Sequence, residues 1–170
     1  MPESEHPAHR RVREAALRKG VEIEIVTFPE STHTALDAAH ALGAELGQIV
    51  KSLVFAAPAD DDALEPVLAL VSGANRVDVA RLAAVVGEPR LRRATAREAD
   101  AMTGFVIGGI PPIGFGRPAR VVMDPDLGRF PIVWAAAGTP NAVFAVPPGT
   151  LRVLADAVVA PVAEIPAPSA

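Results

Sequence analysis

The sequence predicts an α+β domain built on a mixed, largely antiparallel sheet that curls into an open barrel, with helices around it. Three observations predict this class. Short strand patterns are joined by turns containing Gly and Pro, helix patterns fall between them without a regular βαβ alternation, and half of the 170 residues are hydrophobic. We expect residues 1–170 to form a single domain, with its core over residues 21–163, an N-terminal helix over 1–20 and a disordered tail over 164–170.

The first elements are predicted from periodicity and capping residues. Pro7 to Lys19 show a basic amphipathic pattern, which predicts a helix packed outside the core. Val21 to Ile25 alternate between apolar and acidic residues, as expected for a strand with one buried face. Thr34 and Asp37 form a shortened capping box, so a helix is expected over residues 35–42.

The remaining elements follow from the same signals. Residues 49–57 and 66–72 read as two strands of a central hairpin around the acidic turn 59–65. Helices are predicted over 78–86 and 95–104, because each begins at a capping residue and ends near a glycine. The last predicted elements are three strands and a helix, at Val121–Asp124, Pro131–Ala136, Ala142–Val146 and from Thr150 onward.

Composition excludes several classes of function. The absence of cysteine excludes disulfides, thiolate metal sites and a cysteine nucleophile. The four histidines form no metal-binding pattern, and the motifs of phosphate-binding loops, serine esterases and zinc proteases are missing, so neither a metal nor a cofactor is expected. A net charge of −4 requires a local basic face or a partner if the ligand is a nucleic acid. Without a long apolar run, we expect a soluble, cytoplasmic protein with no membrane association.

Lys51 is unusual because it stands in an otherwise apolar strand. Alternation places it on one face with Leu53 and Phe55, while Val50 and Val54 point the other way. Its ammonium group must reach past its neighbours into solvent, which is the commoner arrangement, or lie in a cavity where it meets an anion.

Two glycine-containing segments can present polar groups to a ligand. From Gly104 to Gly114, four glycines and two prolines interrupt apolar residues, so backbone amides can face a phosphate or an oxyanion, although a tight turn explains the same pattern. The segment 137–141 is either a hairpin loop or a place where Thr139 and Asn141 meet a ligand. His33 is either a solvated loop residue or part of a site beside the first strand.

Taken in order, these segments resemble the YbaK/EbsC and prolyl-tRNA synthetase editing-domain family. The resemblance covers about residues 21–163, nearly the whole chain. It rests on five motifs that occur in the family's order: Thr34-Ala-Leu-Asp-Ala-Ala39, Ile49-Val-Lys51-Ser-Leu-Val-Phe55, Ser72-Gly-Ala-Asn-Arg-Val-Asp78, Thr103-Gly-Phe-Val-Ile-Gly-Gly-Ile-Pro-Pro-Ile-Gly114 and Ala137-Gly138.

The resemblance implies a free-standing deacylase that hydrolyses mischarged aminoacyl-tRNA, usually proline tRNA carrying Ala, Cys, Ser or Thr. The family is thought to use a hydroxyl of the terminal adenosine to assist the attacking water, or a cysteine substrate's own thiol. Lys51 matches the family's lysine, and Gly108 and Gly109 match its glycine loop. By this resemblance Lys51 binds the terminal phosphate or the ribose, and the loop amides position the carbonyl oxygen. The other candidate substrate-binding residues are Thr34, Leu53, Phe55, Ser72, Ile110, Pro112, Gly138 and Asn141.

Two departures leave the amino acid open. Asn141 stands where some relatives carry a histidine that helps to select a small substrate, and Pro111 stands where many carry a small polar residue. Two other functions fit the same residues. One is a module that binds an aminoacyl or nucleotide-like ligand, or a synthetase, without catalysis. The other is a structural partner that docks on prolyl-tRNA synthetase through the basic residues within 10–19 or 90–97.

Overall fold

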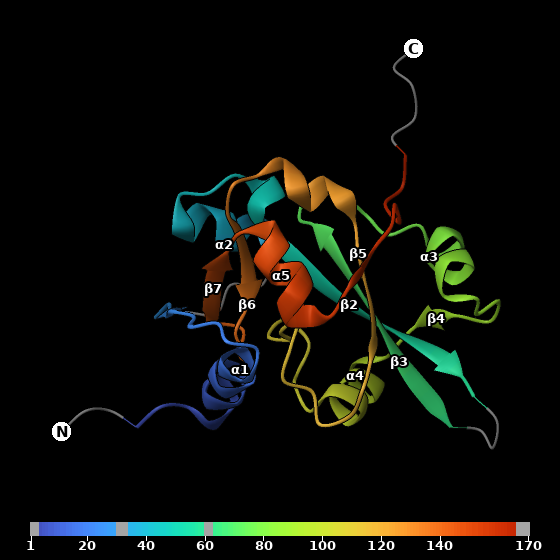
Figure 1. Cartoon of the computed structure of the whole chain (residues 1–170), viewed down its shortest axis with the longest axis horizontal. Coiled ribbons are helices and arrows are strands. Elements are labelled where there is room, and N and C mark those ends of the chain that lie inside the picture. Colours follow the sequence, from blue (N-terminus) through green and yellow to red (C-terminus); the bar gives the residue numbers. More distant parts are fainter. Residues whose placement is uncertain (1–3, 30–33, 60–62, 166–170) are drawn as a thin grey trace, which may run out of the picture.

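The computed structural model describes residues 4–29, 34–59 and 63–165, whose strands form two sheets flanked by helices (Figure 1). The α-helices are α1 (Pro7–Arg18), α2 (Ala35–Leu42), α3 (Val79–Val86), α4 (Ala96–Thr103) and α5 (Pro148–Ala155). The strands are β1 (Ile25–Thr27), β2 (Val50–Pro58), β3 (Leu64–Ser72), β4 (Arg92–Arg93), β5 (Arg120–Met123), β6 (Val133–Ala136), β7 (Ala142–Val146) and β8 (Val158–Val159). Two short 3-10 helices are η1 (Leu46–Gln48) and η3 (Pro125–Arg129).

The pairing confirms a mixed, largely antiparallel α+β architecture. The strand orders are β1-β7-β6 and β4-β2-β3-β5-β8, and the neighbours are antiparallel except for the β3–β5 and β5–β8 pairs. The two sheets meet at an isolated bridge between Ile49 and Trp134. The strands therefore form two sheets where one was predicted, and the predicted open barrel is not confirmed.

Three helices begin and end where their capping residues predict. Thr34 and Thr95 each form a reciprocal capping box, and the Asp78 side chain accepts a hydrogen bond from the Arg81 amide. All three helices end at a glycine with positive φ, namely Gly43, Gly87 and Gly104. Among the helices of the described residues, none is long and apolar enough to cross a membrane.

Some of the predicted elements differ from the structure. The first strand is Ile25–Thr27 rather than 21–25, because its pairing with β7 begins only at the Ile25–Phe144 pair. Val21 and Ile23 lie before this pair, and their alternation reflects packing against the core. The last helix begins two residues before Thr150, with Pro147 as its N-cap. The short strands β4 and β8 were not predicted, and the predicted tail over 164–170 lies outside the described residues from 166 onward.

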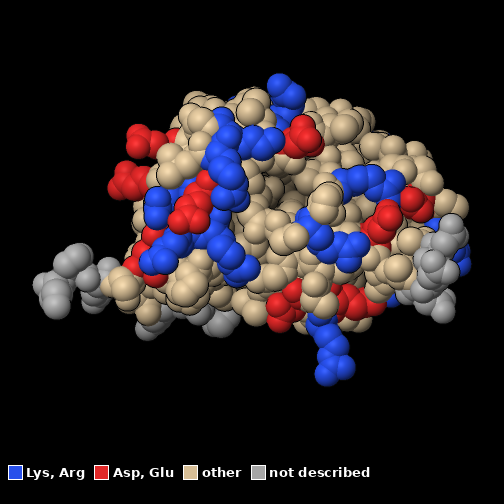
Figure 2. Space-filling view, turned by 60° about the horizontal axis from the view of Figure 1, so that its bottom comes forward, with Lys and Arg blue, Asp and Glu red and all other residues tan. Residues whose placement is uncertain are grey.

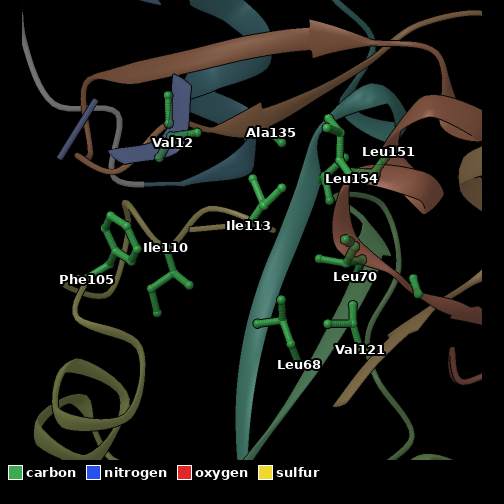
Figure 3. Packing of buried hydrophobic residues seen from close by; sticks show 14 of the residues in the cluster. Val12, Leu68, Leu70, Phe105, Ile110, Ile113, Val121, Ala135, Leu151 and Leu154 are labelled. Atoms are coloured by element: carbon green, nitrogen blue, oxygen red, sulfur yellow. The ribbon is translucent and has the colours of Figure 1, made fainter. Parts of the chain in front are cut away.

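The core occupies both faces of the five-stranded sheet. The first core cluster joins one face to the three-stranded sheet and the helices α1 and α5, and Figure 3 shows part of it; it includes Val12, Val54, Leu68, Leu70, Ile110, Phe144 and Leu151. The second core cluster covers the opposite face and includes Phe55, Val67, Val71, Leu82 and Val122. Because Ala8, Val12, Ala15 and Ala16 are buried in the first cluster, the expectation that the N-terminal helix packs outside the core is wrong.

Candidate functional site

A cavity of about 320 Å³ lies between α2, β2, the two strands β6 and β7, and the loop that follows α4. Its wall is mainly apolar, and a few polar side chains interrupt it. The apolar lining includes Ile49, Val50, Val54, Ala94, Ile110, Trp134, Ala142 and Val143, and the polar lining residues are Thr34, Lys51, Ser52 and Arg93. A cavity of this size and polarity is typical of a small-molecule site.

Lys51 lies at the cavity wall and is partly buried. Its Nζ donates a hydrogen bond to the carbonyl oxygen of Asn75, and it forms no ion pair with a carboxylate of the described residues. Burial lowers the pKa of Lys51, and the positive charges of Arg76 and Arg93 lower this pKa further. The ammonium group still has donors available for an anionic or polar ligand.

The two central glycines of the loop after α4 have different surroundings. Gly108, with φ +96°, is exposed and lines the cavity, and its N–H has no acceptor among the described residues. Gly109 is buried, and its N–H already donates to the carbonyl of Val106 at 3.0 Å. A Cβ at Gly109 would lie 2.6 Å from the backbone of Thr139. Gly108 therefore faces the cavity, whereas Gly109 lets two loops pack against each other.

The loop 137–141 closes one side of the cavity through Pro140. Gly138 has φ +105° and packs so closely on α1 that a Cβ would lie 2.9 Å from the carbonyl oxygen of Ala8. The Asn141 side chain accepts from the Thr139 hydroxyl at 2.7 Å and donates to the carbonyl of Phe28 at 3.1 Å. Gly138 and Asn141 thus hold the loop in place and do not line the cavity.

Helix α1 holds both loops that border the cavity. A ring nitrogen of His9 lies 2.8 Å from the Thr139 hydroxyl, and Thr139 donates to Asn141, so the His9 Nε2–H is the donor. Arg11 donates to the carbonyl of Gly104 at 3.1 Å, and its guanidinium carbon lies 4.4 Å from the centre of the Phe105 ring. The amphipathic pattern of α1 gave no sign of these contacts, because it does not identify what the helix packs against.

We expect His9→Ala to loosen the loop 137–141 and to lower the free energy of unfolding by about 1 kcal/mol, the contribution of one hydrogen bond. Hydrogen exchange of the Ala137 and Ala142 amides, which bond within this loop, should become faster. His9→Gln should restore part of the protection through its side-chain N–H. The exposed His40 gives the control variant His40→Ala, and equal exchange in the His9 and His40 variants would contradict the assignment.

The other predicted site residues divide into two groups. Thr34, Leu53 and Ile110 line the cavity. Three others are buried away from the cavity wall, namely Phe55, Ser72 and Pro112. Phe55 belongs to the second core cluster, and the Ser72 hydroxyl donates to the carbonyl of Gly47 at 2.8 Å. Pro112 is buried in the loop that follows α4. His33 lies outside the described residues.

Two polar lining residues were not predicted as ligands. The sequence places Arg93 only in a basic segment, and no sequence pattern distinguishes Ser52, yet both line the cavity. The Ser52 hydroxyl is buried and has no hydrogen-bond partner among the described residues. The adjacent arginines Arg92 and Arg93 are a sequence signal for a cation at this place. They form the short strand β4, which pairs with β2 and extends the sheet beside it.

Basic side chains gather on one face of the molecule. Figure 2 shows Lys and Arg on two sides of a hollow in one face, with Asp and Glu among them. Some of the arginines are neutralised by ion pairs, such as Arg13 with Glu5 at 2.8 Å and Arg92 with Glu98 at 2.7 Å. Within the described residues, no group of three or more His, Cys, Asp or Glu side chains could hold a metal ion.

Comparison with known proteins identifies the type of domain. Residues 29–154 match the model of the family described as the aminoacyl-tRNA editing domain. A solved structure described as a candidate trans-editing enzyme for prolyl tRNA synthetase superposes with a TM-score of 0.85 at 46% identity, covering 95% of this chain and 99% of that one.

Curated relatives agree with this match. The Multifunctional Ser/Thr-tRNA deacylase ProXp-y of Escherichia coli (strain K12) is 31% identical over 123 residues, which are 70% of each protein. The Proline--tRNA ligase of Limosilactobacillus fermentum is 33% identical over 95 residues, 56% of this chain but only 17% of the ligase. The similarity to the ligase is therefore confined to a small part of that enzyme.

Proposed function

Because the chain belongs to the aminoacyl-tRNA editing domain family, we propose that it is a trans-editing hydrolase that deacylates mischarged aminoacyl-tRNA during translation. Its substrate is proline tRNA carrying Ala, Cys, Ser or Thr, and it acts in the cytoplasm. The observation that carries this proposal is the mainly apolar cavity whose lining includes both Lys51 and Gly108. The names of the deacylase and trans-editing relatives support the same chemistry.

In the proposed reaction, water adds to the ester carbonyl and the bond to the ribose oxygen breaks. The ribose oxygen takes up a proton, and the products are the free amino acid and the uncharged tRNA. The Gly108 N–H donates to the carbonyl oxygen as negative charge develops on it, which is where a fixed donor accelerates acyl transfer most. A hydroxyl of the terminal adenosine assists the water, and Lys51 holds the phosphate or ribose so that the ester stays in place.

In this proposal the cavity of about 320 Å³ takes the aminoacyl group together with the edge of the terminal adenosine. A mainly apolar wall lowers the local dielectric constant, which strengthens the hydrogen bond to the developing oxyanion. The small side chains Ala94, Ala99, Ala136 and Ala142 leave room for substrate, whereas Ile110 and Trp134 limit it. A wall of this kind favours a small amino acid, while one methyl group changes selectivity by only about 10- to 200-fold.

The deciding experiment measures deacylation of proline tRNA charged with Ala, Cys, Ser or Thr, with and without prolyl-tRNA synthetase. Lys51→Ala should lower kcat/KM by about 10- to 100-fold, because it removes a hydrogen bond from a charged group. The matched control is Lys19→Ala, which removes the chain's other lysine, an exposed residue at the end of α1. If wild type hydrolyses none of these esters under any condition, the enzyme proposal fails and the ligand-binding module takes its place.

A further inference from the structure

Two cations line the cavity and a third follows a contact of Lys51 in the chain, and the proposed reaction uses only one of the three. Lys51 and Arg93 both line the cavity. Arg76 directly follows Asn75, whose carbonyl accepts the hydrogen bond from Lys51. The positive charges of Arg76 and Arg93 also lower the pKa of Lys51, as expected when like charges are near it.

Within the part of the chain that the structure describes, these three side chains lack an acidic counterpart, although neighbouring arginines have one. Arg92 pairs with Glu98 at 2.7 Å and Arg81 with Asp78 at 3.6 Å. Among the described residues, no carboxylate forms an ion pair with Lys51, Arg76 or Arg93. Asp126 is engaged instead by the Asn75 side chain, at 2.8 Å. Like charges held together without a counter-ion favour binding of an anion from outside the chain.

Strand pairing places the Arg93 side chain on the same face of the sheet as Lys51. Arg93 pairs with Phe55 across β4 and β2, and its guanidinium carbon lies 5.8 Å from the centre of the Phe55 ring. Its side chain therefore lies on the face of β2 that also carries Lys51, at the exposed edge of the cavity. A guanidinium group binds a phosphate through two parallel N–H bonds, whereas the lysine ammonium acts as a point charge.

We propose that Lys51, Arg76 and Arg93 form a site for a phosphodiester of the tRNA acceptor end, next to the aminoacylated nucleoside in the cavity. This inference rests on the proposed function and adds two binding residues, Arg76 and Arg93, that do not touch the reacting ester. Phosphate contacts at this edge allow an acidic protein to bind nucleic acid through a local basic site. They also orient the terminal nucleotide, so that its ester enters the cavity.

The test measures the Kd of an uncharged CCA trinucleotide for wild type, Arg93→Gln and Arg76→Gln at several salt concentrations. Each substitution should raise the Kd by about tenfold and reduce the slope of log Kd against log salt by about 0.7, the value for one phosphate contact to a single strand. The matched control is Arg92→Gln, because Arg92 is the adjacent residue and is paired with Glu98. Its Kd and its salt slope should equal those of wild type.

The inference is overturned if the trinucleotide does not bind, if the salt slope is unchanged in the Arg93 and Arg76 variants, or if Arg92→Gln has the same effect as they do. Thermal unfolding of each variant shows whether the fold is intact. Hydrolysis of aminoacyl-adenosine, an ester without phosphate, by wild type reports on the proposed reaction separately. Trinucleotide binding with the expected slopes but no hydrolysis of any ester would support the phosphate site and reject the deacylase.

Discussion

Gly109→Ala is expected to lower kcat/KM for aminoacyl-tRNA deacylation by about 10²- to 10³-fold. The new Cβ would lie 2.6 Å from the Cα and carbonyl carbon of Thr139, and backbone atoms cannot rotate away as a flexible side chain does. The two loops must therefore separate. Gly108 and Pro140 belong to these loops and line the cavity, so both residues are displaced. A displacement of about 1 Å in a positioned group can cost about 10² in rate, and loss of an oxyanion donor costs about 10²–10³.

The control for this variant is Gly116→Ala. Gly116 is exposed, lies in the segment that follows the same loop, and has no atom within 4 Å of the position of a Cβ. Its substitution should leave kcat/KM within about twofold of wild type. A Gly109→Ala protein with wild-type kcat/KM would show that the contact between the two loops does not position the catalytic groups.

The elements that were predicted correctly depend on interactions within a few residues. The helix over 35–42 is an example, because Thr34 and Asp37 satisfy the first amide groups and Gly43 adopts the left-handed conformation that ends the helix. The β2–β3 hairpin is another, since its residues alternate between the two core clusters. Such signals are contained in the local sequence and need no knowledge of the tertiary structure.

The details of the site could not be predicted, because they depend on packing between distant segments. Both faces of β2 are apolar, so alternation did not tell which residues meet the cavity, and Phe55 was assigned to the site although it packs in the second core cluster. The function of Gly109 depends on Thr139, thirty residues further along the chain. Helix α1 lies before the matched residues 29–154, yet it holds both loops through His9 and Arg11.

Asp124→Ala is expected to lower the free energy of unfolding by about 3 kcal/mol or more. Asp124 is only 2% exposed, and its carboxylate accepts three backbone hydrogen bonds. Two of the donors, the amides of Val162 and Ala163 at 2.9 Å, belong to the segment that follows β8. Each buried donor that loses its acceptor costs about 1–3 kcal/mol. Urea unfolding followed by circular dichroism measures the loss, and this C-terminal segment should exchange its amide hydrogens first.

A pair of matched substitutions separates the carboxylate of Asp124 from a general effect of removing negative charge. Asp124→Asn puts an NH₂ group where an oxygen accepts backbone N–H groups, so the loss should be about 1.5–3 kcal/mol, as for a hydrogen bond to a charged group. Asp126→Asn makes the same chemical change two residues away, where the side chain is partly exposed and accepts one bond from Asn75. Its effect should stay below about 1 kcal/mol. Equal losses in the two variants would show that the C-terminal segment is held by its apolar contacts, with Val162 in the second core cluster, and that the buried carboxylate adds little.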